Sequence, residues 1–166
     1  MEYSIQQIAL DLAKKITERA LLSEGFSLDL MSSLALEDCK AAAREIIQVL
    51  ISDMNLAIRE NKESRKEAGL LIKEHDRPRD IVTELGRIRF ARDYYFSKNE
   101  SMYVSPIDEI LDINSYDRVS KGISAKLVEA ATDYSYQHSA NIVADGLGML
   151  SKLRVYKKNC SCICKT

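Results

Sequence analysis

The chain has 166 residues, of which 46% are hydrophobic and 30% charged, so it can bury a core and lacks the composition of an intrinsically disordered protein. The N-terminus has no basic segment followed by an apolar run, and the longest apolar stretch, from about Ile46 to Ile58, is interrupted by polar residues. We therefore expect neither a secretory signal nor a membrane span, and we expect a cytoplasmic protein with reduced thiols.

Charge is distributed unevenly along the chain, although the net charge is only −1. Residues 151 to 166 contain five basic residues and no acidic one, which leaves 19 of the 24 basic residues with all 25 acidic residues in the first 150. A basic end on an acidic body is suited to contact a polyanion, and it is equally typical of a solvated tail.

The first 77 residues are predicted to be helical. Tyr3 to Leu22 carries apolar residues at spacings of three and four, which is the pattern of an amphipathic helix. After a break at Gly25 and Ser27, a long helix is expected from Leu30 to Lys73, ended by Pro78. Its apolar stripe consists of Leu36, Cys39, Ala43, Ile46, Leu50 and Ala57, widened by Ile47, Ile51, Met54 and Ile58. Such a stripe packs either on the first helix or on a second copy of the chain, and both alternatives remain open.

Residues 78–104 change to a period of two, which predicts a small antiparallel ribbon. Ile88 and Phe90 alternate with Arg87 and Arg89, and Gly86 suits a tight turn between two strands. Residues 98–101 are expected to form a second turn before a short third strand at residues 102–104.

Residues 105–159 return to a helical pattern. Pro106 at the first helical position, with Ser105 as cap, predicts a short helix to about Leu111. Ser120 is expected to cap the next helix, of which one face consists of Ile123, Leu127, Ala130 and Tyr134. A further helix from Tyr136 to Ala144, a glycine break and a last helix follow. The fold class is therefore mainly α with a small antiparallel β ribbon, and the Cys-rich residues 160–166 form a tail.

The order helix, glycine turn, basic helix at the C-terminus is that of a helix-turn-helix, whose second helix enters the DNA major groove. The side chains that would meet DNA are Ser151, Lys152, Arg154, Lys157 and Lys158. A solvated helix end is the alternative. The ribbon adds Arg87, Arg89 and Arg92, for which cross-strand pairing with the neighbouring acids is the simpler account.

The sequence favours neither an enzyme nor a cofactor site. The acidic residues are scattered, and no phosphate loop, dinucleotide fingerprint or nucleophile motif is found. His75 and His138 lie in polar surroundings and are expected to be exposed, whereas Cys39 is expected in the core. The alternate spacing of Cys160, Cys162 and Cys164 does not fit a zinc knuckle. We therefore expect no catalytic residue, no metal, no cofactor and no small-molecule substrate.

Three blocks of sequence, taken in order, resemble the ISLre-type insertion-sequence transposases. The first is residues 79–95, with a Thr, a Gly three later, a Phe, an Arg and paired tyrosines. The second is the acidic segment at residues 108–113, continued by residues 116–120. The third is residues 126–131, followed by Ser135, Tyr136 and Ala140. Together they cover about residues 30 to 151.

The resemblance implies a DNA-binding N-terminal part that recognises the ends of a transposable element, with Tyr136 at the entry to the helix-turn-helix and with homodimerisation as a candidate property. Members of that family continue for several hundred residues into a nuclease domain with an acidic triad, to which nothing in this chain corresponds. Catalysis is therefore not expected. The Cys-rich end departs from the family's recognition helix, and we interpret it as the product of a frameshift or premature stop. A helical protein–protein interaction module is the alternative function.

Overall fold

The computed structural model describes residues 5–22, 27–135 and 137–141. The chain forms two compact units. The first contains residues 1–79 and 89–111, and the second contains residues 80–88 and 112–166. None of the helices in the described part of the chain combines the length and the hydropathy needed to cross a bilayer.

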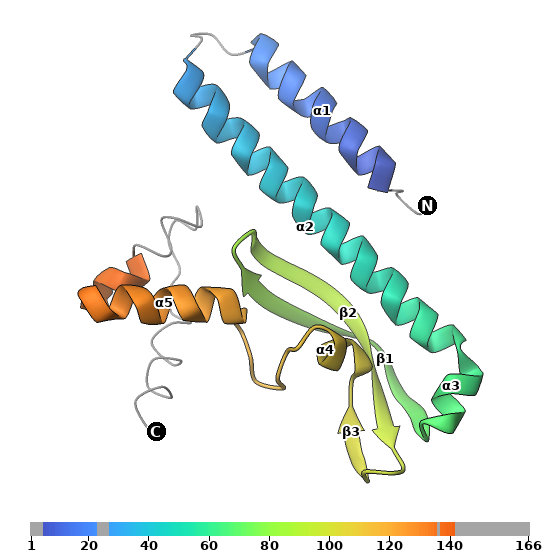
Figure 1. The fold of residues 1–166 in the computed structure, drawn as a ribbon. Helices are drawn as coiled ribbons and strands as arrows, with labels where there is room; N and C mark the ends of the chain where they lie inside the picture. Colours follow the sequence, from blue (N-terminus) through green and yellow to red (C-terminus); the bar gives the residue numbers. More distant parts are fainter. Residues whose placement is uncertain (1–4, 23–26, 136, 142–166) are drawn as a thin grey trace. The chain divides into compact units, whose positions relative to one another are not determined.

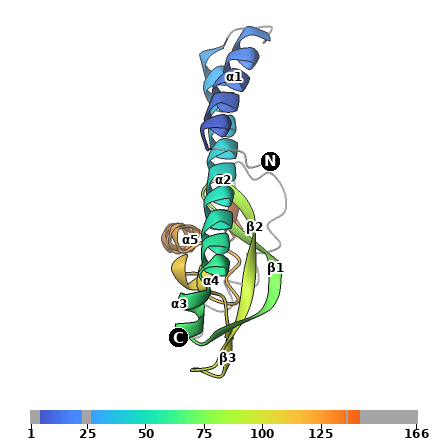
Figure 2. The ribbon, with the colours of Figure 1, turned by 90° about the vertical axis from the view of Figure 1, so that its right-hand side faces the viewer.

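The first unit begins with an antiparallel helical hairpin. Helix α1 (Ile5–Leu22) runs along the N-terminal half of helix α2 (Leu28–Glu60), as Figures 1 and 2 show. Between them lie Ile8 of α1 and Ala42 of α2, both buried. The carboxylate of Asp38 is also buried, and it pairs with Lys15 Nζ at 2.9 Å and with Arg19 Nη1 at 3.1 Å. The predicted first helix is confirmed, and ion pairs fix its register on α2.

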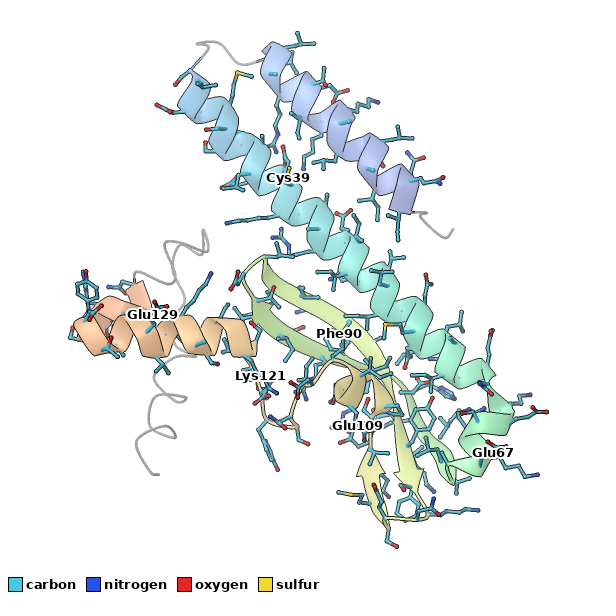
Figure 3. The ribbon with its side chains drawn as sticks, in the orientation of Figure 1. Cys39, Glu67, Phe90, Glu109, Lys121 and Glu129 are labelled. Carbon is cyan, nitrogen blue, oxygen red and sulfur yellow. The ribbon has the colours of Figure 1, made fainter. Side chains whose placement is uncertain are left out.

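The expected apolar stripe of the long helix is confirmed at Ile51, which is buried, and is wrong at other positions. Cys39 is exposed (Figure 3), and Leu36 and Leu50 keep 56% and 46% of their surface. The buried residues of α2 are Asp38, Ala42, Ile51 and Asn55. Because the two cations of α1 neutralise Asp38, the face that carries this carboxylate can be buried, and the neighbouring apolar face stays outside.

The long helix also ends earlier than predicted. Asn61 interrupts it and accepts a hydrogen bond from Ser64 N–H (3.1 Å), which starts the short helix α3 (Lys62–Glu67). Gly69, with φ +67°, then turns the chain into strand β1 (Leu70–Thr83). Pro78 therefore lies within a strand instead of ending a helix. β1 is an edge strand, where a residue without an N–H is tolerated.

The predicted ribbon is a three-stranded antiparallel sheet in the order β1-β2-β3. β2 is Gly86–Ser97, and β3 is Met102–Val104, whose residues pair with Tyr95 to Ser97. The first turn uses Gly86 at φ +105°, and the Thr83 hydroxyl donates to Gly86 O (3.0 Å) and accepts from Leu85 N–H (3.3 Å). Along residues 86–90 buried and exposed side chains alternate as predicted.

Two short helices follow the sheet. Helix α4 (Pro106–Ile110) in the first unit has Pro106 at its start as expected, but the Ser105 side chain makes no capping hydrogen bond. Helix α5 (Lys121–Asp133) in the second unit is capped by Ser120, whose hydroxyl accepts from Ile123 N–H. Lys121 and Glu129 mark its course in Figure 3. Residues 137–141 are helical.

The second unit has a small core of its own. Val82 of the hairpin makes an isolated parallel bridge with Val119, and both pack with Ile123 against Leu127 and Ala130. Val82 N–H donates to Arg118 O (3.0 Å), and Ser120 N–H donates to Val82 O (2.8 Å). The predicted apolar face of α5 is confirmed except at Tyr134, which lies beyond the helix end, is 52% exposed and contacts His138 edge to face.

Candidate functional site

One stripe of α2 is aimed at strand β2 and is largely polar. The stripe consists of Gln48, Ile51, Asn55 and Arg59, spaced by three and four residues. Gln48 Nε2 donates to Arg89 O (2.8 Å), and Asn55 Oδ1 accepts from Asp93 N–H (3.0 Å). The side-chain amides of Gln48 and Asn55 thus form hydrogen bonds with backbone groups of β2, and these bonds fix the helix on the strand.

The centre of this contact is Asp93, whose side chain is fully buried. Arg59 binds it with two hydrogen bonds, from Nε to Oδ2 (2.7 Å) and from Nη2 to Oδ1 (2.8 Å). The N–H of Asp76 donates to Oδ1 (3.0 Å), and the Tyr95 hydroxyl lies 3.5 Å from Oδ2. His75 Nδ1 lies 3.5 Å from the same oxygen, while its ring is half exposed. We call these residues the Asp93 cluster.

The environment of the Asp93 cluster determines its charges. Burial acts to raise the pKa of Asp93, but the hydrogen bonds from Arg59 and from the Asp76 N–H outweigh it, so that the pKa lies below its usual range. The carboxylates of Asp93 and Asp76, which both accept hydrogen bonds from Arg59, raise the pKa of Arg59. Burial together with the charge of Asp93 raises the pKa of Tyr95. The cluster therefore holds an ionised carboxylate and a guanidinium in a bidentate pair, a geometry that favours structural anchoring.

A second buried ion pair joins two of the sequence blocks described above. Arg92, from the first block, pairs with Asp108, from the second, and Arg79 Nη1 lies 3.8 Å from the same carboxylate. Burial and the neighbouring Arg79 lower the pKa of Arg92 to about 10, which leaves the guanidinium charged at neutral pH. The side chains of Arg79 and Arg92 are each only 8% exposed. Residues of the first and second sequence blocks are thus in contact in the fold.

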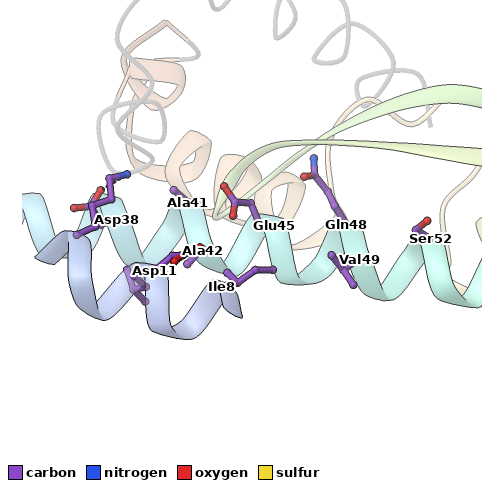
Figure 4. A pocket seen from close by; sticks show the side chains of 11 residues that line it. Ile8, Asp11, Asp38, Ala41, Ala42, Glu45, Gln48, Val49 and Ser52 are labelled. Atoms are coloured by element: carbon purple, nitrogen blue, oxygen red, sulfur yellow. Dashed lines mark ion pairs between the residues drawn. The ribbon is translucent and has the colours of Figure 1, made fainter. Parts of the chain in front are cut away.

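The helical hairpin carries a groove of about 680 Å³ (Figure 4). Its floor includes the small residues Ala41 and Ala42, and Asp11, Asp38 and Glu45 line it together with Lys15. It extends along α2 from Asp38 to Ser52 and is closed on one side by Ile8 and Leu12 of α1. Within the described residues no group of three His, Cys, Asp or Glu side chains is arranged to hold a metal ion.

Of the residues predicted to contact DNA, three are described by the structure and the others are not. Tyr136, Ser151, Lys152, Arg154, Lys157 and Lys158 lie outside the described residues, as do Cys160, Cys162 and Cys164. Arg87 is exposed and lies 3.6 Å from Asp80, and Arg89 is exposed. Arg92 is buried against Asp108, so a structural role accounts for it better than a contact with DNA.

Sequence reasoning missed the Asp93 cluster. From the sequence, Asp93 is one of the neighbouring acids expected to pair across strands with the arginines of the ribbon, and His75 is expected only to be exposed. The available signal was weak: polar Asn55 and Arg59 share one helical face with the apolar Ile51, which indicates that this face meets a polar partner.

The comparisons with known proteins give a family. The model of an uncharacterised protein family (UPF0236) matches residues 21–160. UPF0236 protein TTE2489 of Caldanaerobacter subterraneus subsp. tengcongensis is 32% identical over 136 residues, which are 81% of this chain and 29% of that protein. UPF0236 protein TTE0402 of the same organism is 31% identical over 138 residues, 82% of this chain and 27% of that protein. No solved structure matches the chain.

The fold and the Asp93 cluster define a mainly helical protein in which a long helix is fastened to a three-stranded antiparallel sheet by a buried ion pair. The chain belongs to the uncharacterised protein family UPF0236. It spans less than a third of the length of the curated relatives named above.

Proposed function

We propose that this chain is the DNA-binding N-terminal part of a transposase-like protein, that it recognises the ends of a mobile element, and that it has no catalytic activity of its own. The support comes from the resemblance of its three sequence blocks to ISLre-type transposases. The single observation that carries the proposal is the basic segment of residues 151–166, which holds five basic residues and no acid and follows α5 and the helix at residues 137–141.

The described cations of the second unit are mostly engaged by acids. Arg87 pairs with Asp80, Lys121 with Asp112, and Lys126 with Glu84 at 3.0 Å. Because these pairs are neutral overall, they add little attraction for phosphate. We therefore assign the DNA contact to Tyr136, Ser151, Lys152, Arg154, Lys157 and Lys158, with the exposed Arg89 as a secondary contact and no such role for the paired Arg87.

The test is an electrophoretic shift with duplex DNA that carries the terminal inverted repeats, at two salt concentrations. Replacing Lys152 and Arg154 together by Ala should weaken binding and flatten the logarithmic salt dependence by about one unit of slope per lost phosphate contact. The matched control replaces Lys14 and Lys62, two exposed lysines of the first unit, and should bind as the parent does. Equal affinity and equal salt slope for parent and Lys152/Arg154 variant would contradict the proposal.

The proposed lack of catalysis is tested separately. Metal-assisted phosphoryl transfer needs converging carboxylates, and the acidic residues of this chain are scattered along the sequence. The purified chain should therefore not cut or join DNA with Mg²⁺ or Mn²⁺. Metal-dependent cleavage that is abolished by replacing one of its acidic residues would show this expectation to be wrong.

A homodimer through the helical hairpin is the second candidate function, and it would make the chain an interaction module. The observation that favours it is the exposure of large apolar residues on both helices, because Leu10, Leu21, Leu22, Leu28 and Leu36 are 56% to 81% exposed. In α1, Ile8 is the one buried residue. Leu36→Asp should then convert a dimer to a monomer in sedimentation analysis, and Val128→Asp on α5 is the matched control. A parent chain that is monomeric at every accessible concentration would exclude this function.

A further inference from the structure

Three aromatic rings gather on one face of the sheet in the first unit. Tyr94 and Phe96 are two residues apart on β2 and therefore share a face, and Tyr103 of β3 pairs with Phe96 in the register. The ring of Tyr103 stacks on that of Tyr94, with centroids 6.3 Å apart and planes 21° apart. It meets Phe96 edge to face at 5.4 Å. We call Tyr94, Phe96 and Tyr103 the aromatic face.

Cations from β1 lie over this aromatic face. The ammonium of Lys73 is 5.9 Å from the centre of the Phe96 ring, and the guanidinium of Arg77 is 4.9 Å from that of Tyr94. Below them, the buried Arg92 lies 5.6 Å from the Tyr94 ring. The acid beside these cations is Glu74, which lies 3.4 Å from Arg77, and both of these side chains are about half exposed. An exposed pair of this kind exchanges readily with another anion.

Cross-strand packing explains why the rings touch one another, but it does not explain their exposure. Tyr103 keeps 59% of its surface. The exposed Tyr103 belongs to the same aromatic face over which Lys73 and Arg77 lie, and these two cations are also exposed.

We propose that the aromatic face binds single-stranded nucleic acid, with a base stacked on Tyr103 and the phosphate backbone beside Lys73 and Arg77. Open aromatic rings combined with adjacent cations are the elements of single-strand recognition, because every base has a flat face and every nucleotide a phosphate. An apolar protein partner would use the rings but not the two flanking cations. The aromatic face shares no residue with the basic segment to which duplex binding was assigned above, so this inference goes beyond the proposed function.

The test uses fluorescence anisotropy with labelled oligo(dT) and oligo(rU) of roughly 20 nucleotides, longer than the site of a typical single-strand binding fold. Tyr103→Ala in the full chain should weaken binding of the preferred oligonucleotide about 5- to 150-fold, the range for loss of one stacked base. Tyr103→Phe keeps a ring and should bind within about twofold of the parent. The two oligonucleotides show whether the strand is DNA or RNA.

The matched control is Tyr116→Ala, because Tyr116 is 93% exposed in the second unit and has no place in the aromatic face. It should leave affinity unchanged. Lys73→Ala should also reduce the logarithmic salt slope by about 0.7, the value for one phosphate contact with a single strand. Thermal melting followed by circular dichroism checks that Tyr103→Ala folds.

The inference would be overturned by the absence of binding of either oligonucleotide to the parent at low salt, or by equal affinity of the parent and Tyr103→Ala. The replacement of Lys152 and Arg154 separates this inference from the proposed function. That variant should lose duplex binding and still show the full effect of Tyr103→Ala on oligo(dT) or oligo(rU). If instead Tyr103→Ala has no effect in that background, the single strand binds elsewhere and the inference is wrong.

Discussion

Replacing Asp93 by Asn tests whether the buried ion pair fastens helix α2 to the sheet. The substitution preserves the size of the side chain but removes its charge and places an amide near the Arg59 guanidinium, where two donors would face each other. The two hydrogen bonds from Arg59, at 2.7 and 2.8 Å, are weakened or lost. The backbone bond from Asp93 N–H to Asn55 does not depend on the carboxylate and should persist.

The expected magnitude follows from the burial of the two partners. Removing one partner of a buried pair costs about 3–5 kcal/mol, because the remaining charge is left without compensation. Arg59 is 29% exposed and keeps Asp76 at its Nη2, so that the lower end, about 3 kcal/mol, applies. For a chain of this length, that loss lowers the Tm by about 6–12 °C.

The assay is guanidinium unfolding at pH 7, followed by circular dichroism. Asp76→Asn is the matched control, since it removes the other carboxylate from Arg59 at a position that is 61% exposed. Asn also tolerates the left-handed conformation of Asp76, whose φ is +53°. We expect a loss below about 1 kcal/mol for this control. Similar losses for Asp93→Asn and Asp76→Asn would refute the argument that burial makes the Asp93 pair important.

Three further predictions concern stability and are measured by the same unfolding assay. The pKa of Asp93 is lowered on folding, so the stabilisation by its carboxylate is complete above the unfolded pKa of about 3.9 and is lost as the pH falls through the folded pKa. The difference in unfolding free energy between the parent and Asp93→Asn should therefore shrink between about pH 5 and pH 3, and a constant difference would contradict this. Gly69→Ala should lower the free energy of unfolding by about 1–2 kcal/mol, because φ is +67° and the new Cβ would lie 3.2 Å from the Asn99 side chain. Gly122→Ala within α5 should instead leave this free energy unchanged or raise it, because alanine favours the helix. Ser120→Ala should lower the free energy of unfolding by about 1 kcal/mol, because the capping hydrogen bond of α5 is lost. An unchanged free energy of unfolding would mean that this hydrogen bond does not stabilise the helix.

The sequence predicted the turns of the sheet and the strands β2 and β3 because local signals determine them. The alternation of residues 86–90, the turn at Gly86 and the short third strand at residues 102–104 all depend on neighbours within a few positions. The start of α4 at Pro106 and the cap at Ser120 are equally local. These features needed no knowledge of what packs against them.

Tertiary partners decided the features that the sequence did not predict. Cys39 was expected inside on hydrophobicity alone, but Lys15 and Arg19 compensate Asp38 and so bury the adjacent face. The strand at residues 70–77 reads as the polar end of a helix, because its residues are charged and mostly exposed. In the Asp93 cluster, Arg59 and Asp93 are 34 positions apart in the sequence, and no local pattern indicates such a partnership.

The residues that carry the resemblance to transposases are, in this fold, mainly those that build it. Thr83 and Gly86 form the first turn, Arg92 pairs with Asp108, and Ser120 caps α5. Because these side chains bond within the protein, the resemblance argues most directly for a shared architecture. The binding proposed above rests on residues outside this set, namely Tyr103 and the basic residues near the C-terminus. A relative that keeps the buried set but replaces Tyr103 by a small residue should therefore fold in the same way and fail to bind the single strand.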